Sequence, residues 1–204
     1  MSLILAIDPG ITGAYAIVQS DGHVLRVDDL PIIADLKTKW IDGAVLVDQW
    51  VEWLGSYDVT CVIERVHPMP ENGSQAAFSQ GMTLASLLVS LQMVQARIEF
   101  VAPQTWKRDL GLIAKPGMTD TARKRMSIDK ARLLFPHAPL DRQKDHGRAE
   151  ALLISHWYLQ RASLKAANKV AKDSVKAQAK PKPGTTRELF SEWLAEPQLP
   201  EKPF

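Results

Sequence analysis

The stretch LILAIDPG at residues 3–10 decides the fold of this chain. Its five leading apolar residues are typical of a fully buried β-strand, and Pro9-Gly10 ends that strand directly after Asp8. The sequence GAYAIV at residues 13–18 predicts a second strand. In open α/β sheets, sites are built where the strands end and the sheet opens to solvent. Asp8 is therefore a candidate site residue, although Asp-Pro-Gly is also the chemistry of an ordinary turn.

A second acidic residue ends a strand of the same kind. Residues 58–64 read DVTCVIE, a short, β-branched and apolar run that closes on Glu64. If this strand lies parallel and adjacent to the first, the carboxylates of Asp8 and Glu64 meet at one edge of the sheet. Two ionised carboxylates so placed raise each other's pKa unless a cation lies between them, and oxygen ligands suit Mg²⁺ or Mn²⁺. Two unrelated surface carboxylates are the alternative.

A third acidic cluster lies in KDHGRAEALL at residues 144–153. From Arg148 onward the chain holds no Pro or Gly until Pro181, which predicts a long helix that begins near residue 146. His146 and Glu150 are four residues apart and share one face of it. Asp145 stands at the expected N-cap, where capping alone would explain it, and Glu150 could simply favour the positive helix end. The apolar neighbours of Glu150 nevertheless place it toward the protein interior, where an unpaired carboxylate is costly.

The remaining pattern predicts an α/β protein with one mixed sheet. Strands are expected at about 3–8, 13–19, 23–30, 58–64 and 98–101, and helices at about 44–55, 75–96, 104–110, 120–135 and from 146 onward. Three antiparallel strands are thus followed by strands that alternate with helices. The helix at 75–96 is apolar nearly all round, which predicts that it is buried.

Composition excludes several classes of protein. The 204 residues are 46% hydrophobic with a net charge of +2, which suits one compact domain and a tail. The single Cys61 rules out a disulfide framework or a Cys-based zinc site and fits a reducing, cytosol-like compartment. The apolar run at the start is too short for a signal peptide, and no stretch is long enough to span a bilayer, so no membrane partner is expected.

Basic residues gather in two places. The central cluster flanks the proposed metal site, which favours phosphate contact by Lys107, Arg108, Arg123, Lys124, Arg125, Lys130 and Arg132. The second cluster lies on one helical face and consists of Lys165, Lys169, Lys172, Lys176 and Lys180. An ordinary solvated helix surface is the alternative explanation for these lysines. We therefore expect a nuclease-like domain at 1–162 and an extension at 163–204. That extension ends in a tethered amphipathic helix around Phe190 and Trp193, which either packs on the domain or docks on a partner.

Five segments together resemble the RuvC family of Holliday junction resolvases, and especially its phage and prophage branch. They are AIDPGITGA at 6–14, VIERV at 62–66, VAP at 101–103 through Trp106-Lys107, Lys130 through LFP at 134–136, and HGRAEAL at 146–152. The resemblance covers about residues 3–160. It implies an RNase H-like fold and an endonuclease that cuts four-way DNA junctions by symmetric nicks. It also implies a twofold homodimer, in the cytoplasm of a bacterial host.

The family uses four metal-binding positions, and three of them match Asp8, Glu64 and Glu150. Relatives place Asp or His three or four residues before the last acid. Here Gly147 cannot bind metal, so His146 is assigned to the fourth position, with Asp145 as the runner-up. The resemblance implies two Mg²⁺ ions per site, with Mn²⁺ able to substitute, one activating the attacking water and the other stabilising the leaving 3′ oxygen. The catalytic set is then Asp8, Glu64, His146 and Glu150, and His146 could instead handle a proton.

The loop after Glu64 should lie near the junction centre. His67 occupies the position where bacterial relatives carry a stacking aromatic, and His67 or Met69 could insert between bases. The helix at 75–96 is a candidate dimer face, with plain core as the alternative. Other hypotheses are a hybrid-cutting or flap-cutting RNase H-like nuclease, a non-catalytic DNA-binding relative, and an actin-like or sugar-kinase-like ATPase. The chain is short for the ATPase class and lacks its second Gly-rich phosphate loop.

Overall fold

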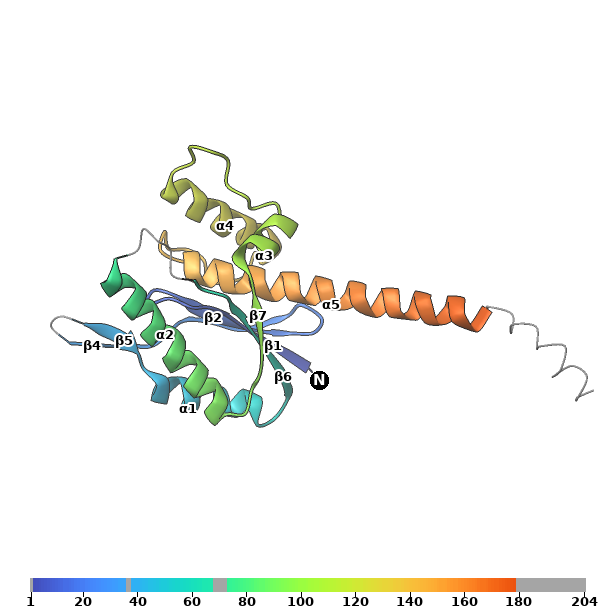
Figure 1. Ribbon diagram of the computed structural model, residues 1–204, viewed down its shortest axis with the longest axis horizontal. Coiled ribbons are helices and arrows are strands. Elements are labelled where there is room, and N and C mark those ends of the chain that lie inside the picture. The colour runs from blue at the N-terminus through green and yellow to red at the C-terminus, as the bar shows by residue number, and fades with distance from the viewer. Residues whose placement is uncertain (1, 36–37, 68–72, 179–204) are drawn as a thin grey trace, which may run out of the picture. The chain divides into compact units, whose positions relative to one another are not determined.

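The computed structural model describes residues 2–35, 38–67 and 73–178, and its centre is a five-stranded mixed sheet (Figure 1). The strand order is β3-β2-β1-β6-β7, where the strands are β1 Ser2–Asp8, β2 Ala14–Gln19, β3 Val24–Asp29, β6 Asp58–Glu64 and β7 Arg97–Val101. β1, β2 and β3 pair antiparallel, whereas β6 pairs parallel with both β1 and β7. The predicted mixed sheet is confirmed, and β1 lies at its centre.

Helices cover both faces of this sheet (Figure 1). α1 Gly43–Leu54 and α2 Ser74–Met93 lie on one face, and α3 Pro103–Asp109, α4 Asp120–Leu134 and the start of α5 His146–Gln178 lie on the other. Alternate residues of β1 supply the two cores, because successive strand side chains point to opposite faces. Leu3 and Leu5 pack with the α1 and α2 side, and Ile4 and Ala6 pack with the α3, α4 and α5 side.

Two features differ from the sequence prediction. A small antiparallel hairpin, β4 Ile32–Ala34 and β5 Lys39–Ile41, was not predicted, because three-residue strands leave too few positions for an alternating pattern. The burial expected for α2 is wrong as well. Its buried side chains are confined to one stripe (Thr83, Leu87, Ser90 and Leu91), while its exposed apolar residues are Phe78, Met82, Val89 and Met93.

The chain divides into two units, residues 1–162 and 163–204, and the boundary falls within α5. Of the second unit, residues 163–178 are described, and they are helical. Lys165, Lys169 and Lys172 are exposed there. Lys180 and the amphipathic helix expected around Phe190 and Trp193 lie outside the described residues. None of the helices in the described part of the chain combines the length and hydropathy of a membrane-spanning segment.

Candidate metal centre and nucleic-acid interface

The parallel pairing of β1 and β6 brings two carboxylates to one edge of the sheet. Ile7 pairs with Ile63, so Asp8 and Glu64 follow at the same level as the last residues of their strands. The turn after Asp8 is tight: a Cβ on Gly13 would lie 2.1 Å from the Asp8 carbonyl oxygen, so only glycine fits there. The two strands lie parallel and adjacent, as the prediction required, and each ends in an acidic residue at the same edge of the sheet.

The N-terminus of α5 delivers the other acidic group to the same place. The carboxylates of Asp8 and Glu150 and the imidazole of His146 each offer a ligand atom, and these three atoms lie within 4.8 Å of one another. Gly147 packs against the turn after β1, because a Cβ there would lie 2.9 Å from the carbonyl oxygen of Thr12. Close contact of α5 with this turn therefore brings the last acid to the first.

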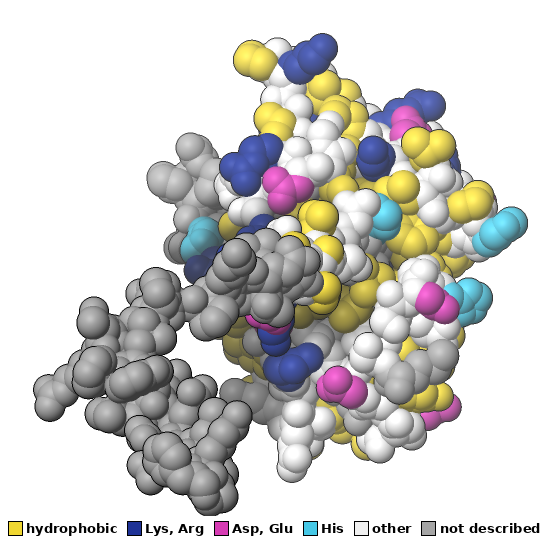
Figure 2. Space-filling view, turned by 90° about the vertical axis from the view of Figure 1, so that its right-hand side faces the viewer, with side chains coloured by type: hydrophobic (Ala, Val, Ile, Leu, Met, Phe, Trp, Pro, Cys, Tyr) yellow, Lys and Arg dark blue, Asp and Glu magenta, His cyan; other side chains and the backbone are white. Residues whose placement is uncertain are grey.

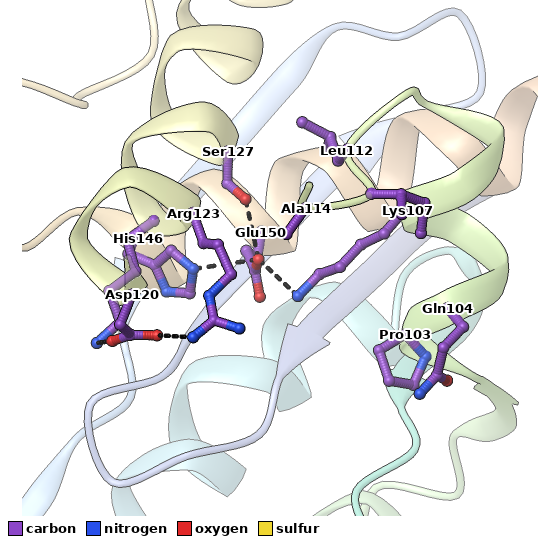
Figure 3. Close-up of a pocket in the computed structure, with 12 residues that line it drawn as sticks. Pro103, Gln104, Lys107, Leu112, Ala114, Asp120, Arg123, Ser127, His146 and Glu150 are labelled. Atoms are coloured by element: carbon purple, nitrogen blue, oxygen red, sulfur yellow. Dashed lines mark hydrogen bonds and ion pairs between the residues drawn. The ribbon is translucent and has the colours of Figure 1, made fainter. Parts of the chain in front are cut away.

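Three donors from three helices converge on one oxygen of Glu150 (Figure 3). Oε1 lies 2.8 Å from Lys107 Nζ on α3, 3.0 Å from Ser127 Oγ on α4 and 3.1 Å from His146 Nε2 on α5. Burial alone would raise the pKa of Glu150, but the hydrogen bond and charge of His146, together with Lys107, outweigh it and lower the pKa to about 2. Glu150 is buried, as predicted, and it stays ionised.

In the other two carboxylates, the effects that raise the pKa prevail. Burial raises the pKa of Asp8 well above its ordinary value, and the charges of Glu150 and Glu64 raise it further against the opposing effect of Lys107. The pKa of Glu64 is raised as well, because burial and the charge of Glu150 outweigh the lowering effects of Lys107, Trp106 and His146. A cation between these groups would relieve the repulsion, and carboxylate oxygens with an imidazole nitrogen are suitable ligands for a divalent metal ion. The residues present therefore fit a metal ion.

Glu64 is held from the side by α3. Trp106 is fully buried and donates its indole N–H to Glu64 Oε2 over 2.7 Å. The next residue, Lys107, places its ammonium 4.9 Å from the centre of the Trp106 ring while it contacts Glu150. Two consecutive residues of α3 thus bind carboxylates from β6 and from α5.

Asp145 takes part in a different network. Its buried carboxylate accepts hydrogen bonds of 2.6 Å from both the backbone N–H and the Nε of Arg142. Arg142 and Arg148 also bind Asp29 at the end of β3, at 2.9 Å and 2.6 Å. Asp145 is absent from the metal-ligand group of the described residues. It contacts Arg142 and Arg148, and these two arginines connect it to Asp29 at the end of β3. The structure thus brings His146 to Asp8 and Glu150 and directs Asp145 elsewhere.

A pocket of about 370 Å³ opens beside Glu150 (Figure 3). Its polar lining includes Lys107, Asp120, Arg123, Lys124, Ser127 and His146, and its other walls include Pro103, Gln104, Leu112, Ile113 and Ala114. Asp120 pairs with both neighbouring cations, at 3.7 Å from Arg123 and 2.9 Å from Lys124. The lining therefore holds cations beside a buried anionic centre.

The other residues predicted to bind DNA lie outside this pocket. Arg108 and Arg125 are exposed and pair with Asp109 and Asp129. Lys130 lies further along α4, where its charge lowers the pKa of His156 after the larger effect of burial. His67 is exposed, and Met69 lies outside the described residues. On the face shown in Figure 2, most of the visible Lys and Arg side chains lie in the upper half, at the level of α3 and α4 in Figure 1.

Sequence reasoning missed two residues that contact the acids, Trp106 and Ser127. Trp106 stood within a matched segment, but nothing in its spacing showed which carboxylate its indole would meet. Ser127 lies one helical turn after Arg123 and Lys124. A polar residue on the same helix face as these two cations was the signal that could have identified it as a site residue.

Comparison with solved structures places this fold among the RuvC-like structures. Thermus thermophilus RuvC in complex with a Holliday junction substrate superposes with a TM-score of 0.57, at 15% identity over 80% of this chain and 96% of that one. A second structure of Thermus thermophilus RuvC gives a TM-score of 0.53, at 16% identity over 78% of this chain and 96% of that one. The RNase H-like, RuvC-like fold predicted from the motifs is confirmed.

The sequence itself is similar to one curated resolvase. The chloroplastic Holliday junction resolvase MOC1 of Chlamydomonas reinhardtii is 37% identical over 93 residues, which are 45% of this chain. The match spans 10% of the length of that relative. No family model matches the chain. The resemblance to RuvC-type resolvases is thus confirmed by fold and, over part of the chain, by sequence.

Proposed function

We propose that this protein is a metal-dependent endodeoxyribonuclease that cuts four-way DNA junctions. The observation that carries the proposal is the meeting of Asp8, Glu64, Glu150 and His146 at one strand edge of a RuvC-like sheet. The structural match to a RuvC bound to a Holliday junction and the sequence match to a junction resolvase support it.

The metal would be Mg²⁺, with Mn²⁺ able to replace it, and Asp8, Glu64, Glu150 and His146 would hold it. When bound, such ions activate a water nucleophile and neutralise charge on the scissile phosphate. His146 rather than Asp145 fills the fourth position, because the carboxylate of Asp145 is occupied by Arg142.

The protein's own side chains would prepare this site. His146 and Lys107 keep Glu150 ionised, and together with Ser127 they fix the direction of its carboxylate. The charges of Glu150 and Glu64 raise the pKa of Lys107 in spite of its burial, so its ammonium stays protonated. A protonated amine at the mouth of the pocket would orient a DNA phosphate toward the carboxylates.

The surface around the pocket would bind the DNA backbone. Arg123 and Lys124 line it from α4, and a phosphate there would compete with Asp120 for both cations. Arg108, Arg125, Lys130 and His67 would extend this contact, as would Met69. We assign residues 1–162 as the nuclease domain and 163–204 as an extension whose exposed lysines add phosphate contacts.

A junction requires two symmetric nicks, and we propose that a homodimer makes them. The exposed apolar residues of α2, Phe78, Met82, Val89 and Met93, favour this helix as the contact between the two copies. We place the reaction in the cytoplasm of a bacterial host, and the single buried Cys61 fits the reducing compartment that this proposal requires.

The test is a cleavage assay on four end-labelled substrates of matched length: a four-way junction, a linear duplex, an RNA:DNA hybrid and a flap. We expect Mg²⁺-dependent cutting of the junction in preference to the other three. Glu64→Gln should bind the junction and leave it uncut, since the change removes a charge and keeps the side-chain shape. Preferential cutting of the hybrid or the flap would assign the protein to another class of RNase H-like nuclease.

A further inference from the structure

The contact between Trp106 and Glu64 is more than the burial of an aromatic side chain requires. A buried indole N–H usually finds a partner, yet this fold tolerates exceptions. Trp50 is as fully buried as Trp106, and its Nε1 has no hydrogen-bond partner among the described residues. Burial by itself therefore does not explain why the Trp106 N–H meets a carboxylate.

The backbone directs Trp106 onto Glu64. Glu64 pairs with Val101 across β6 and β7, and the N–H of Arg65 donates to the Val101 carbonyl over 2.7 Å. Pro103 then opens α3 two residues after Val101. A helix that begins so soon after the paired residue carries its first-turn side chains back over the end of β6.

The chemistry of the donor suits a carboxylate that must remain available to a cation. An indole N–H is neutral, so it fixes Oε2 without adding a further positive charge beside this carboxylate. In the described part of the chain, Trp106 is the one hydrogen-bond donor to this carboxylate. Oε1 is left for another ligand.

We infer that Trp106 is a positioning residue that holds the Glu64 carboxylate in the direction required for metal binding. The inference rests on the proposed function, because it assigns Glu64 to the metal. Hydrogen-bond partners of metal ligands orient them, and their loss commonly weakens metal binding by about 10- to 100-fold. Lys107 acts in parallel on Glu150, so α3 would set two ligands at once.

The experiment is a calorimetric titration of the metal-free protein with Mn²⁺. Trp106→Phe should weaken Mn²⁺ binding by about 10- to 100-fold. Trp50→Phe is the matched control: it removes an equally buried indole whose N–H has no partner among the residues that the structure describes, and its Mn²⁺ affinity should stay that of the unaltered protein. In a Glu64→Gln background, Trp106→Phe should add little, because residues that act through one another are not additive. Equal Mn²⁺ affinity in Trp106→Phe and in the unaltered protein would overturn the inference.

A second measurement does not depend on whether the Trp106 variant folds. In the ¹⁵N–¹H spectrum of the unaltered protein, the indole signal of Trp106 should move on addition of Mg²⁺, and that of Trp50 should stay in place. An unmoved Trp106 signal at saturating Mg²⁺ overturns the inference. Mn²⁺ binding that depends on Trp106 and Glu64, in a protein that cuts no junction, would support the inference and refute the nuclease proposal.

Discussion

Because Gly147 contacts the turn after β1, alanine at this position should lower the free energy of unfolding, whereas alanine in place of Gly81 should raise it. A Cβ at position 147 would lie 2.9 Å from the Thr12 carbonyl oxygen and 3.2 Å from two backbone atoms of Gly13. Backbone atoms cannot rotate away as a side chain can, and overpacking of this kind costs about 1–3 kcal/mol. Alanine recovers up to about 1 kcal/mol of helix propensity. With the full helix gain subtracted, we expect Gly147→Ala to lower the free energy of unfolding by about 0–2 kcal/mol.

Gly81 is the matched control. It lies within α2, and in the described part of the chain no atom beyond its chain neighbours and its own helix backbone lies within 4 Å of a Cβ placed on it. Gly81→Ala should therefore raise the free energy of unfolding by up to about 1 kcal/mol. Both variants are measured by denaturant unfolding at one protein concentration, and each kcal/mol should also move the melting temperature by about 2–4 °C. If Gly147→Ala is as stable as Gly81→Ala, the close contact between α5 and the turn after β1 is refuted.

Three further predictions concern charge. In EDTA, Asp8→Asn should melt at a higher temperature than the unaltered protein, since it removes a carboxylate that burial disfavours and that Glu150 and Glu64 repel. This order should reverse in Mg²⁺, and a lower melting temperature in EDTA would contradict both effects. In Asp29, burial raises the pKa, but hydrogen bonds from the two arginines of its network outweigh burial and hold the pKa below its ordinary value. A carboxyl group whose pKa is lowered in the folded state stabilises the fold at pH values above that pKa. Asp29→Asn should therefore lower the free energy of unfolding at neutral pH, and this loss should shrink as the pH falls through the lowered pKa. A loss that does not change with pH would point to packing instead. Lys107→Ala should flatten the dependence of log junction affinity on log salt by about one unit, and an unchanged slope would exclude a phosphate contact by Lys107.

The sheet could be predicted because its sequence signals are local. The run ending at Asp8 and the run ending at Glu64 are short, apolar and closed by a charge. Their parallel pairing was a condition of the prediction, and the structure supplies it. Burial of Glu150 followed from its apolar neighbours. Asp8 and Glu64 end strands and Glu150 lies one turn into α5, so each stands near the end of a regular element that the sequence marks.

Long-range contacts could not be predicted in the same way. Asp145 is drawn away from the acidic centre by Arg142, which also binds Asp29, 113 residues before it along the chain. The exposed apolar face of α2 could not be predicted, because an apolar composition does not show which side of a helix packs on the sheet. Residues 68–72 and 179–204, where Met69 and the expected terminal helix lie, are outside the described residues, so those expectations stay predictions.

The most direct test of the central proposal is the mapping of cut positions on a four-way junction labelled on each of its four strands. A nuclease built on the Asp8, Glu64 and Glu150 centre should, in Mg²⁺, nick two opposing strands at symmetric positions and leave 5′-phosphates that a DNA ligase can reseal. Glu150→Gln should abolish both nicks while the junction remains bound. Nicks at unrelated positions, ends that cannot be ligated, or undiminished cutting by Glu150→Gln would contradict the proposed mechanism.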